Sequence, residues 1–270
     1  MTKTIFITGA STGLGRATAL LFAGKGWKVI ATMRDPSKEA ELKATANVTV
    51  MALDVTDPAQ IAATAKAALA LGPVDVVFNN AGYGLSGAFE GATDDQLQRQ
   101  LNTNLLGVMR VTQAFLPALR ERGEGTIITT TSIGGLVAFP FNSVYHATKW
   151  GLEGWSESLA YELEPFGIKV KTIAPGGIAT DFAGRSLVVT PHPAYLDAIA
   201  KVTSVFRDPA RRVNSSTAEQ VAEDVWAAVN DPADQVTHVS GNDAKAYYAM
   251  RLKDGIAAFR KTVRASFLGG

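Results

Sequence analysis

Short runs of β-branched and apolar residues alternate with longer segments of helical spacing, and this alternation constrains the fold more than any other feature of the sequence. The predicted strands are Thr4–Thr8, Val29–Thr32, Val48–Leu53, Val74–Phe78, Gly125–Thr131 and Ile168–Ile173. The predicted helices between them are Leu14–Gly26, Ala59–Leu71, Asp94–Leu119 and Asn142–Glu164. Strands that alternate with helices are typical of parallel sheets. We therefore predict an α/β fold with one doubly wound parallel sheet flanked by helices.

The pattern changes after the sixth predicted strand. No clear strand is expected from Gly176 to Ser215, and loops of this length in a compact domain are usually functional or disordered. We interpret residues 176–215 as a substrate lid with short helices of its own. A helix over Thr217–Val229, a short edge strand over Gln235–Val239 and an amphipathic helix over Lys245–Val263 follow, the last within a helical tail at 242–270. No internal repeat or linker is found, so residues 1–270 are predicted to form one domain.

Charge and cysteine content exclude several function classes. The chain has 26 Lys and Arg against 25 Asp and Glu, a net charge of +1, so a nucleic-acid partner is not expected. It has no cysteine, which excludes disulfides, thiolate metal sites and cysteine nucleophiles and fits a cytoplasmic location. The scattered His146, His192 and His238 lack metal-ligand spacing, so no metal is expected.

A membrane partner is not expected either. The segment Gly125–Thr148 has no charged residue, but Gly134, Gly135 and Pro140 interrupt it. A buried strand followed by a loop explains this segment better than a membrane span. The amino-terminal apolar run is too short for a signal peptide.

The first predicted strand runs into a turn that contains Gly9, Gly13 and Gly15, and a helix follows. Glycines there let backbone amides approach a pyrophosphate at the positive end of the helix. An ordinary βα turn would explain the pattern by itself. Its position in the first βα unit of an alternating chain favours a dinucleotide site and hence a Rossmann-type fold.

The second predicted strand is followed by Met33 and Arg34, where an NAD site would place an acidic residue that binds the ribose. The guanidinium of Arg34 suits a 2′-phosphate, so the sequence favours NADP(H), with NAD(H) possible. Alternatively, Arg34 is a surface charge paired with Asp35. Ser11 and Thr12 are candidates for the same phosphate, or they cap the helix.

Two further strand ends carry polar residues. Asp54 follows the third strand, where it could accept a hydrogen bond from the adenine amino group or begin the helix before Pro58. The fourth strand leads into Asn79-Asn80-Ala81-Gly82, which predicts a turn.

Tyr145 and Lys149 are four residues apart on a predicted helix and therefore share one face. A tyrosine titrates near pH ~10, and an adjacent ammonium lowers its pKa by favouring the phenolate. Tyr145 is therefore a candidate general acid and base, with Lys149 as its electrostatic partner. Ser132 ends the fifth strand, and the loop after it could return it to Tyr145.

The chain resembles the short-chain dehydrogenases/reductases over Lys3 to Thr180, and more loosely to about Val239. The resemblance rests on Thr8-Gly9-x-x-x-Gly13-x-Gly15, Asp54-Val55, Asn79-Asn80-Ala81-Gly82, Asn104-x-x-Gly107, Ser132, Tyr145-x-x-x-Lys149 and Pro175-Gly176-x-x-x-Thr180. Seven motifs in register make it specific.

The resemblance implies that Tyr145 gives a proton to a carbonyl oxygen or takes it from an alcohol, while Ser132 holds that oxygen. It further implies that Lys149 binds the nicotinamide ribose and that Asn104 anchors a water in a proton relay. Thr180 would contact the carboxamide. With the positions discussed above, the implied cofactor-binding residues are Gly9, Ser11, Thr12, Gly13, Leu14, Gly15, Arg34, Asp54, Val55, Asn80, Ala81, Gly82, Tyr145, Lys149, Pro175, Gly176, Ile178 and Thr180.

The chain departs from the family pattern at two places. Thr129-Thr130-Thr131 stands where many members have Asn and a second Ser, and Val239-Ser240-Gly241-Asn242-Asp243 replaces an Asp-Gly-Gly ending. The segment Ala31–Asp35 and the tail resemble the 17β-hydroxysteroid and retinol dehydrogenase branch. That likeness implies a homodimer rather than a tetramer, paired through the helices that carry Asn104 and Tyr145.

We therefore expect an NADP(H)-dependent oxidoreductase that interconverts an apolar ketone or aldehyde and the alcohol, its partner being that small molecule. The apolar preference rests on aromatic residues near the active helix and in the lid, although these could be lid packing: Phe139, Phe141, Phe182, Tyr195 and Phe206. An NAD(H)-linked dehydrogenase is the alternative within this class. A non-catalytic NADP-binding regulator is the alternative outside it, and it has no need of Ser132, Tyr145 and Lys149 together.

Overall fold

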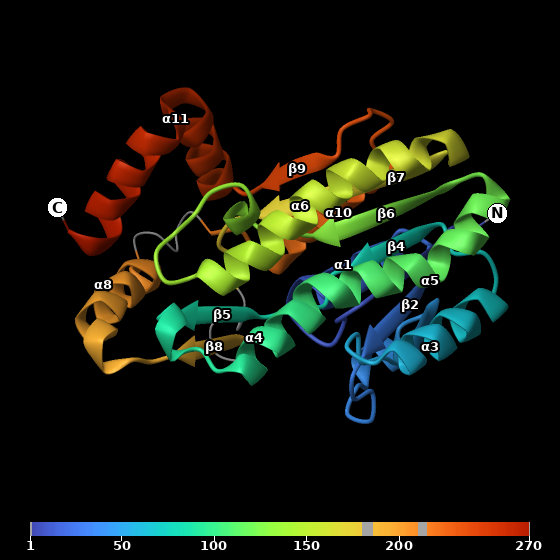
Figure 1. The fold of residues 1–270 in the computed structure, drawn as a ribbon. Helices are drawn as coiled ribbons and strands as arrows, with labels where there is room; N and C mark the ends of the chain where they lie inside the picture. The colour runs from blue at the N-terminus through green and yellow to red at the C-terminus, as the bar shows by residue number, and fades with distance from the viewer. Residues whose placement is uncertain (1, 180–185, 210–214, 270) are drawn as a thin grey trace.

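The computed structural model describes residues 2–179, 186–209 and 215–269. In this part of the chain the main sheet has seven strands, all paired in parallel, in the order β3-β2-β1-β4-β6-β7-β9 (Figure 1). The strands are β1 (Thr4–Ile7), β2 (Lys28–Met33), β3 (Val48–Ala52), β4 (Val76–Asn79), β6 (Gly125–Thr130), β7 (Ile168–Pro175) and β9 (Thr237–Ser240). The order reverses between β1 and β4, which confirms the doubly wound sheet and the edge strand near residue 237.

Helices cover both faces of this sheet (Figure 1). The helices α1 (Gly13–Gly24) and α10 (Ala218–Asn230) share one apolar core with one face of the strands. The helices α3 (Pro58–Ala70), α5 (Gly107–Arg122) and α6 (Ser143–Leu163) build the other core. Two buried faces explain why the strands consist almost entirely of apolar residues.

The helix predicted over Asp94–Leu119 is interrupted. It divides into α4 (Asp94–Leu101), a π-helical segment η2 (Asn102–Leu106) and α5. A π-helical turn inserts a residue and is common at functional sites. The shorter elements are α2 (Glu41–Ala44) and the 3₁₀ turns η1 (Phe89–Gly91), η3 (Ile133–Gly135), η4 (Glu164–Phe166) and η5 (Pro193–Tyr195).

The expectation of no strand between residues 176 and 215 is wrong. Strand β8 (Leu187–Thr190) pairs in parallel with β5 (Gly84–Gly87) as a separate two-stranded sheet. Gly87 has φ +130°, and a Cβ there would lie 2.8 Å from the backbone nitrogen of Thr190. The pairing depends on close approach of the two backbones, which local propensity does not reveal. The helix α8 (Leu196–Arg207) follows β8, as the lid interpretation expected.

The tail forms α11 (Asn242–Leu268), and Gly255 bends it with φ 77° and ψ 170°. The part after the bend buries Phe259, Val263 and Phe267 in a third apolar core shared with α8 and the loop after β6. Thus α8 and α11 lie at the same end of the molecule (Figure 1). Among the described residues, no helix is both long and apolar enough to cross a membrane.

Candidate active site

The glycine-rich turn joins β1 to α1 in a conformation that side chains would prevent. Gly9 and Gly13 have φ +69° and +55°. A Cβ on Gly15 would overlap the carbonyl oxygen of Gly9 and lie 2.6 Å from Nδ2 of Asn80. The turn therefore requires glycine at these positions for conformation and for packing.

The start of α1 fits a bound anion. Its N-cap residue Thr12 makes no side-chain capping hydrogen bond, whereas Asp57, Thr93 and Thr217 cap α3, α4 and α10. The first-turn N–H groups of α1 thus lack a capping side chain, and the hydroxyls of Ser11 and Thr12 are exposed. A pyrophosphate at this end would supply the missing acceptors. Thr12 does not cap the helix, which removes the structural alternative for that residue.

Arg34 is exposed at the end of β2 and forms no ion pair with any residue that the structure describes. Asp35, its expected partner in the alternative interpretation, instead accepts a 2.9 Å hydrogen bond from the backbone of Ser37. Arg34 is therefore available to an anionic ligand. Its charge also helps to hold the pKa of Asp54 down.

Arg16 was missed by the sequence analysis, although it follows Gly15 directly. Its Nη1 lies 3.0 Å from Oε2 of Glu39 and donates a 3.2 Å hydrogen bond to the carbonyl oxygen of Ser11. A second ion pair joins it to Glu41. Arg16 thereby ties the glycine-rich turn to the segment before α2.

Asp54 closes the turn after β3 rather than beginning a helix. Its Oδ1 accepts hydrogen bonds from the backbone nitrogen (2.9 Å) and Oγ1 (2.7 Å) of Thr56. Burial would raise the pKa of Asp54, but the Thr56 hydrogen bonds and Arg34 outweigh it and the pKa is lowered. Asp57 caps α3, so the interpretation of Asp54 as the helix start is wrong. The adenine contact of Asp54 and the cofactor contacts of Leu14 and Val55 stay predictions.

Asn80 connects three strand ends. Its Nδ2 donates to the carbonyl oxygens of Thr8 (3.1 Å) and Gly9 (3.2 Å), and its Oδ1 accepts from Oγ1 of Thr130 at 3.3 Å. Thr8 Oγ1 accepts in turn from the backbone nitrogens of Asn80 and Ala81. The predicted turn at residues 79–82 is thus fixed against the glycine-rich turn.

Ser132, Tyr145 and Lys149 come together at the carboxyl end of β6. The hydroxyl of Ser132 is close enough to Tyr145 to lower the pKa of the phenol. Nζ of Lys149 lies 5.7 Å from the centroid of the Tyr145 ring and donates a 2.8 Å hydrogen bond to the carbonyl oxygen of Thr130. Lys149 is 6% exposed. The backbone carbonyl of Thr130, which any residue type would supply, therefore supports this cluster.

Burial dominates the electrostatics of this cluster. It raises the pKa of Tyr145 above its usual value, against the nearby hydroxyl of Ser132, which lowers it. The expectation that Lys149 brings this pKa down is therefore not met in the structure. Burial also lowers the pKa of Lys149 to about 8, and the nearby Glu153 carboxyl opposes that shift.

Glu153 is a second residue that the sequence analysis missed. It lies one helical turn beyond Lys149 on the same face of α6, a spacing that could have revealed it. Its Oε2 accepts 3.0 Å hydrogen bonds from Oγ1 of Thr172 and of Thr237. Burial raises the pKa of Glu153, with hydrogen bonds from Thr131, Thr237 and Thr172 acting against it.

Asn104 lies in the π-helical segment and holds the backbone before β5. Its Oδ1 accepts from the backbone nitrogen of Tyr83 at 3.0 Å, and its Nδ2 donates to the carbonyl oxygen of Tyr83 at 2.8 Å. A Cβ on Gly82 would lie 3.2 Å from this Oδ1, so Gly82 packs closely on the amide. The implied water relay stays a prediction.

The segment after β7 is anchored by the tail. The backbone nitrogen of Gly177 donates a 2.7 Å hydrogen bond to Oδ2 of Asp243. The backbone nitrogen of Gly176 donates a 3.0 Å hydrogen bond to the carbonyl oxygen of Ser240. A Cβ on Gly176 would overlap the Asp243 carboxylate. Pro175 and Ile178 flank this anchor, and Ile178 bridges to Ser216. Thr180 and Phe182 lie outside the described residues.

The aromatic residues predicted to shape the substrate site pack against one another. Phe139 lies 6.0 Å from Phe206 and 5.5 Å from Phe267 between ring centroids. Phe141 lies 6.2 Å from Tyr195. These rings therefore pack against one another in the structure, and their contacts with a substrate stay a prediction.

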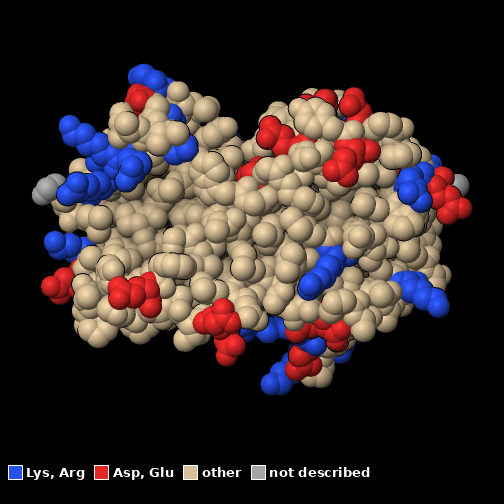
Figure 2. Space-filling view, in the orientation of Figure 1, with Lys and Arg blue, Asp and Glu red and all other residues tan. Residues whose placement is uncertain are grey.

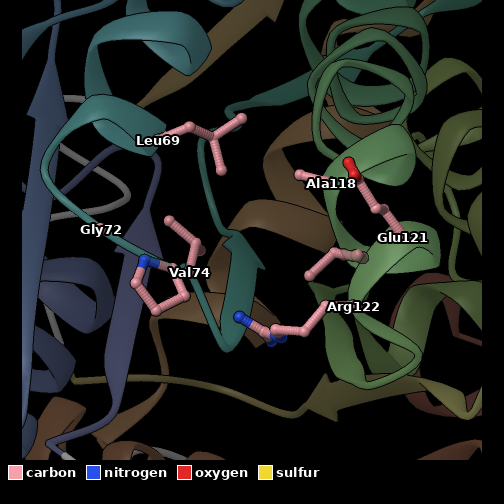
Figure 3. A pocket seen from close by; sticks show the side chains of 8 residues that line it. Leu69, Gly72, Val74, Ala118, Glu121 and Arg122 are labelled. Atoms are coloured by element: carbon pink, nitrogen blue, oxygen red, sulfur yellow. The ribbon is translucent and has the colours of Figure 1, made fainter.

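Two further features of the described residues bear on where a ligand could bind: possible metal clusters and a pocket away from this site. Within the described ranges, no group of three or more His, Asp or Glu residues is arranged to hold a metal ion. A pocket of about 330 Å³ lies between the ends of α3 and α5 and is lined by Leu69, Gly72, Pro73, Val74, Ala118, Leu119, Glu121 and Arg122 (Figure 3). It precedes β4 and β6, at the edge of the sheet opposite to Ser132 and Asn80.

Comparison with known proteins gives a family match. A family model described as short chain dehydrogenase matches residues 3–187. The chain is 41% identical over 209 residues to oxidoreductase BOA17 of Botryotinia fuckeliana, covering 74% of this chain and 76% of that protein. It is 35% identical to human retinol dehydrogenase 8, with coverages of 84% and 76%. Human 17-beta-hydroxysteroid dehydrogenase type 1 is 34% identical, with coverages of 93% and 81%.

Solved structures of similar proteins share the fold of this chain. A short-chain dehydrogenase from Streptomyces avermitilis superposes with a TM-score of 0.84 at 32% identity, covering 98% of both chains. ElxO with NADP bound gives a TM-score of 0.74 at 28% identity, covering 89% of this chain and 96% of that one.

Proposed function

The chain belongs to the short-chain dehydrogenase family, in the branch that resembles retinol and 17β-hydroxysteroid dehydrogenases, and we propose that it is an NADP(H)-dependent oxidoreductase. Its reaction is the interconversion of a fairly apolar ketone or aldehyde and the corresponding alcohol. The observation that carries this proposal is the meeting of Ser132, Tyr145 and Lys149 beside the glycine-rich turn. A binding module has no use for that combination.

Tyr145 is the proposed general acid and base. Its raised pKa keeps the phenol protonated at neutral pH, which suits proton donation to a carbonyl oxygen. The hydroxyl of Ser132 is near that of Tyr145, so a substrate oxygen between the two hydroxyls would be held and polarised. The nicotinamide supplies the hydride when bound.

Lys149 contributes a positive charge close to the phenol. The 2.8 Å hydrogen bond to Thr130 fixes the ammonium, and burial strengthens its field on Tyr145. In the oxidative direction this charge would stabilise the phenolate. Lys149 is also proposed to bind the nicotinamide ribose, Asn80 to lie near the cofactor ribose, and Asn104 to hold a relay water.

The preference for NADP(H) is proposed from the free guanidinium of Arg34 and the exposed hydroxyls of Ser11 and Thr12. A 2.9 Å hydrogen bond from the backbone nitrogen of Ala10 to the carbonyl oxygen of Thr32 places the turn with Ser11 and Thr12 beside the end of β2, and together these groups suit a 2′-phosphate. The NADP-bound state of ElxO is consistent with this proposal. An NAD(H)-linked dehydrogenase is the alternative. Titration with NADPH and with NADH distinguishes between the two.

The apolar substrate class is proposed from the aromatic residues around the site and from the names of the two human relatives. A steroid or retinoid carbonyl is therefore the first substrate to test. Oxidation of NADPH and NADH should be followed by absorbance with steroid, retinoid, aromatic and aliphatic carbonyls. Y145F should abolish turnover and keep NADPH affinity within about twofold. Tight NADPH binding without turnover on any substrate would instead favour the non-catalytic regulator.

We also propose a cytoplasmic homodimer that pairs through the helices that carry Asn104 and Tyr145, which are η2 with α5, and α6. Exposed apolar residues line this face, among them Leu106 (37%), Trp150 (41%) and Tyr161 (76%). Charged groups are sparse over its centre (Figure 2). Light scattering should give twice the chain mass, and L106D should give a monomer.

A further inference from the structure

His146 follows Tyr145 on α6 and is buried at 7% exposure. Both nitrogens of its ring contact the loop between β6 and α6, which carries Ser132. Nδ1 is hydrogen-bonded to the carbonyl oxygen of Gly134, and Nε2 accepts a 3.1 Å hydrogen bond from the backbone nitrogen of Phe139. The backbone nitrogen of Gly134 in turn donates to Oγ of Ser132 at 3.0 Å.

These contacts define the protonation state of the ring. The backbone N–H of Phe139 can only donate, so Nε2 must be unprotonated. The hydrogen of the neutral ring is then on Nδ1, which donates to Gly134. Burial lowers the pKa of His146, which agrees with a neutral ring.

The loop is fitted closely around this ring. A Cβ on Gly134 would lie 2.7 Å from Cε1 and 2.8 Å from Nδ1 of His146. On the other side of the loop, the ring of Phe139 packs 5.1 Å from Tyr247 and 6.0 Å from Phe206. The loop is thus held by α6 on one side and by the lid and tail on the other.

We propose that His146 is a positioning residue for the reaction: it holds the loop so that Ser132 stays within hydrogen-bond reach of Tyr145. This inference rests on the proposed function. The geometry gives the reason, because one connected path of contacts runs from the ring through Gly134 to Oγ of Ser132 and from there to Tyr145. Tyr145 and His146 are neighbours on α6, and the loop carries Ser132. A shift of the loop relative to α6 therefore changes the distance between Ser132 and Tyr145.

The test compares three substitutions at this position in the full chain. H146F keeps a buried ring but loses both hydrogen bonds. H146N places an amide nitrogen near the place of Nδ1 and keeps the donor to Gly134, while H146Q places a carbonyl oxygen near the place of Nε2 and keeps the acceptor for Phe139. H238N is the matched control, because His238 lies on β9 and contacts Gln235.

Because a carbonyl oxygen is held more tightly in the transition state, loss of positioning should lower kcat more than it changes KM. We expect H146F to lose about 10- to 100-fold in kcat, less than removal of an oxyanion donor typically costs. H146N should recover to within about threefold of the wild type, and H238N should match the wild type. NADPH affinity, measured by fluorescence titration, should stay within about twofold of the wild type in each variant. The same titration gives the concentration of folded sites.

Two outcomes overturn the proposal: H146F with kcat per folded site within twofold of the wild type, or H146N as impaired as H146F. If H146F does not fold, H146Q takes its place, because it lacks the donor to Gly134; H146Q with kcat per folded site within twofold of the wild type then overturns the proposal. Nitrogen-15 NMR of the wild type provides a test independent of activity, because the proposal requires a proton on Nδ1 and none on Nε2. A wild type that binds NADPH but turns over no substrate refutes the proposed function. The NMR result still tests how His146 is hydrogen-bonded to the loop.

Discussion

The ammonium of Lys149 donates a 2.8 Å hydrogen bond to the carbonyl oxygen of Thr130, which attaches α6 to the end of β6 two residues before Ser132. The contact holds a charge in a buried place, and burial lowers the pKa of Lys149 to about 8. One lysine thus both builds the site and sets its dependence on pH.

The rate of carbonyl reduction should therefore fall at alkaline pH. As pH rises through about 8, the free enzyme loses the Lys149 charge, while the raised pKa of Tyr145 keeps the phenol protonated. We expect kcat/KM to fall about tenfold per pH unit above that point. K149R keeps its charge throughout and should remove this limb from the pH profile. The same limb in K149R would contradict the assignment.

The stability of the fold should change with pH in the opposite direction. An unfolded lysine titrates near ~10.4, so between about 8 and ~10.4 the unfolded state binds more protons at this residue. The contribution of Lys149 to the free energy of unfolding therefore rises with pH across that window. Urea unfolding at several pH values measures it, with K149M as the control that lacks the contribution.

Loss of the Arg34 charge should discriminate between the two cofactors. Arg34 is exposed and free of ion pairs with any described residue, so R34A should break no ion pair of the fold. A charge-assisted hydrogen bond contributes ~1.5–3 kcal/mol, so NADPH affinity should fall about 10- to 100-fold. NADH affinity should be unchanged, and K38A, on the same loop, should affect neither. Equal loss of both cofactors would refute the phosphate contact.

Substitutions at the starts of α3 and α1 should have different effects, one on stability and the other on NADPH binding. Asp57 caps α3 with hydrogen bonds to Ala59 (2.9 Å) and Gln60 (3.1 Å), whereas Thr12 makes no capping bond to α1. D57A should lower the free energy of unfolding by ~1 kcal/mol and leave NADPH affinity unchanged. T12A should leave stability unchanged and weaken NADPH about 2- to 10-fold. Denaturant unfolding and cofactor titration of both variants check this; a destabilised T12A would contradict it.

Two glycines of α1 should respond in opposite ways to a methyl group. A Cβ on Gly15 would overlap the backbone of Gly9, whereas one on Gly24 meets nothing within 4 Å. G15A should lower the free energy of unfolding by ~1–3 kcal/mol and impair NADPH binding. G24A should raise it by up to ~1 kcal/mol with normal binding. If G15A binds NADPH normally, the close packing of the turn is not required for binding.

Much of the sheet could be predicted from local patterns. The six predicted strands and the edge strand near residue 237 all form, and α1, α3, α6 and α10 lie where helical spacing placed them. Their positions follow from which residues within a few places of one another are apolar, β-branched or glycine. The glycine-rich turn and the pair Tyr145 and Lys149 were visible for the same reason.

The missed features depend on contacts between distant parts of the chain. The pairing of β5 with β8 joins residues about a hundred positions apart, and Gly87 at its end carries no strand signal. The π-helical segment forms where Asn104 reaches the backbone of Tyr83, 21 residues earlier. No local pattern predicts either contact, because their free energy comes from partners that only folding brings together.

The sequence by itself thus determined the parallel α/β sheet, the turn for a dinucleotide and the residues able to carry the chemistry. The tertiary structure decided how these groups are held and which protonation state they favour. Asp57 and not Asp54 caps α3, burial outweighs the hydroxyl of Ser132 in setting the pKa of Tyr145, and His146 fixes the loop that carries Ser132. The reason is physical: spacing along the chain selects local conformation, whereas burial and hydrogen-bond partners exist only after distant segments have packed.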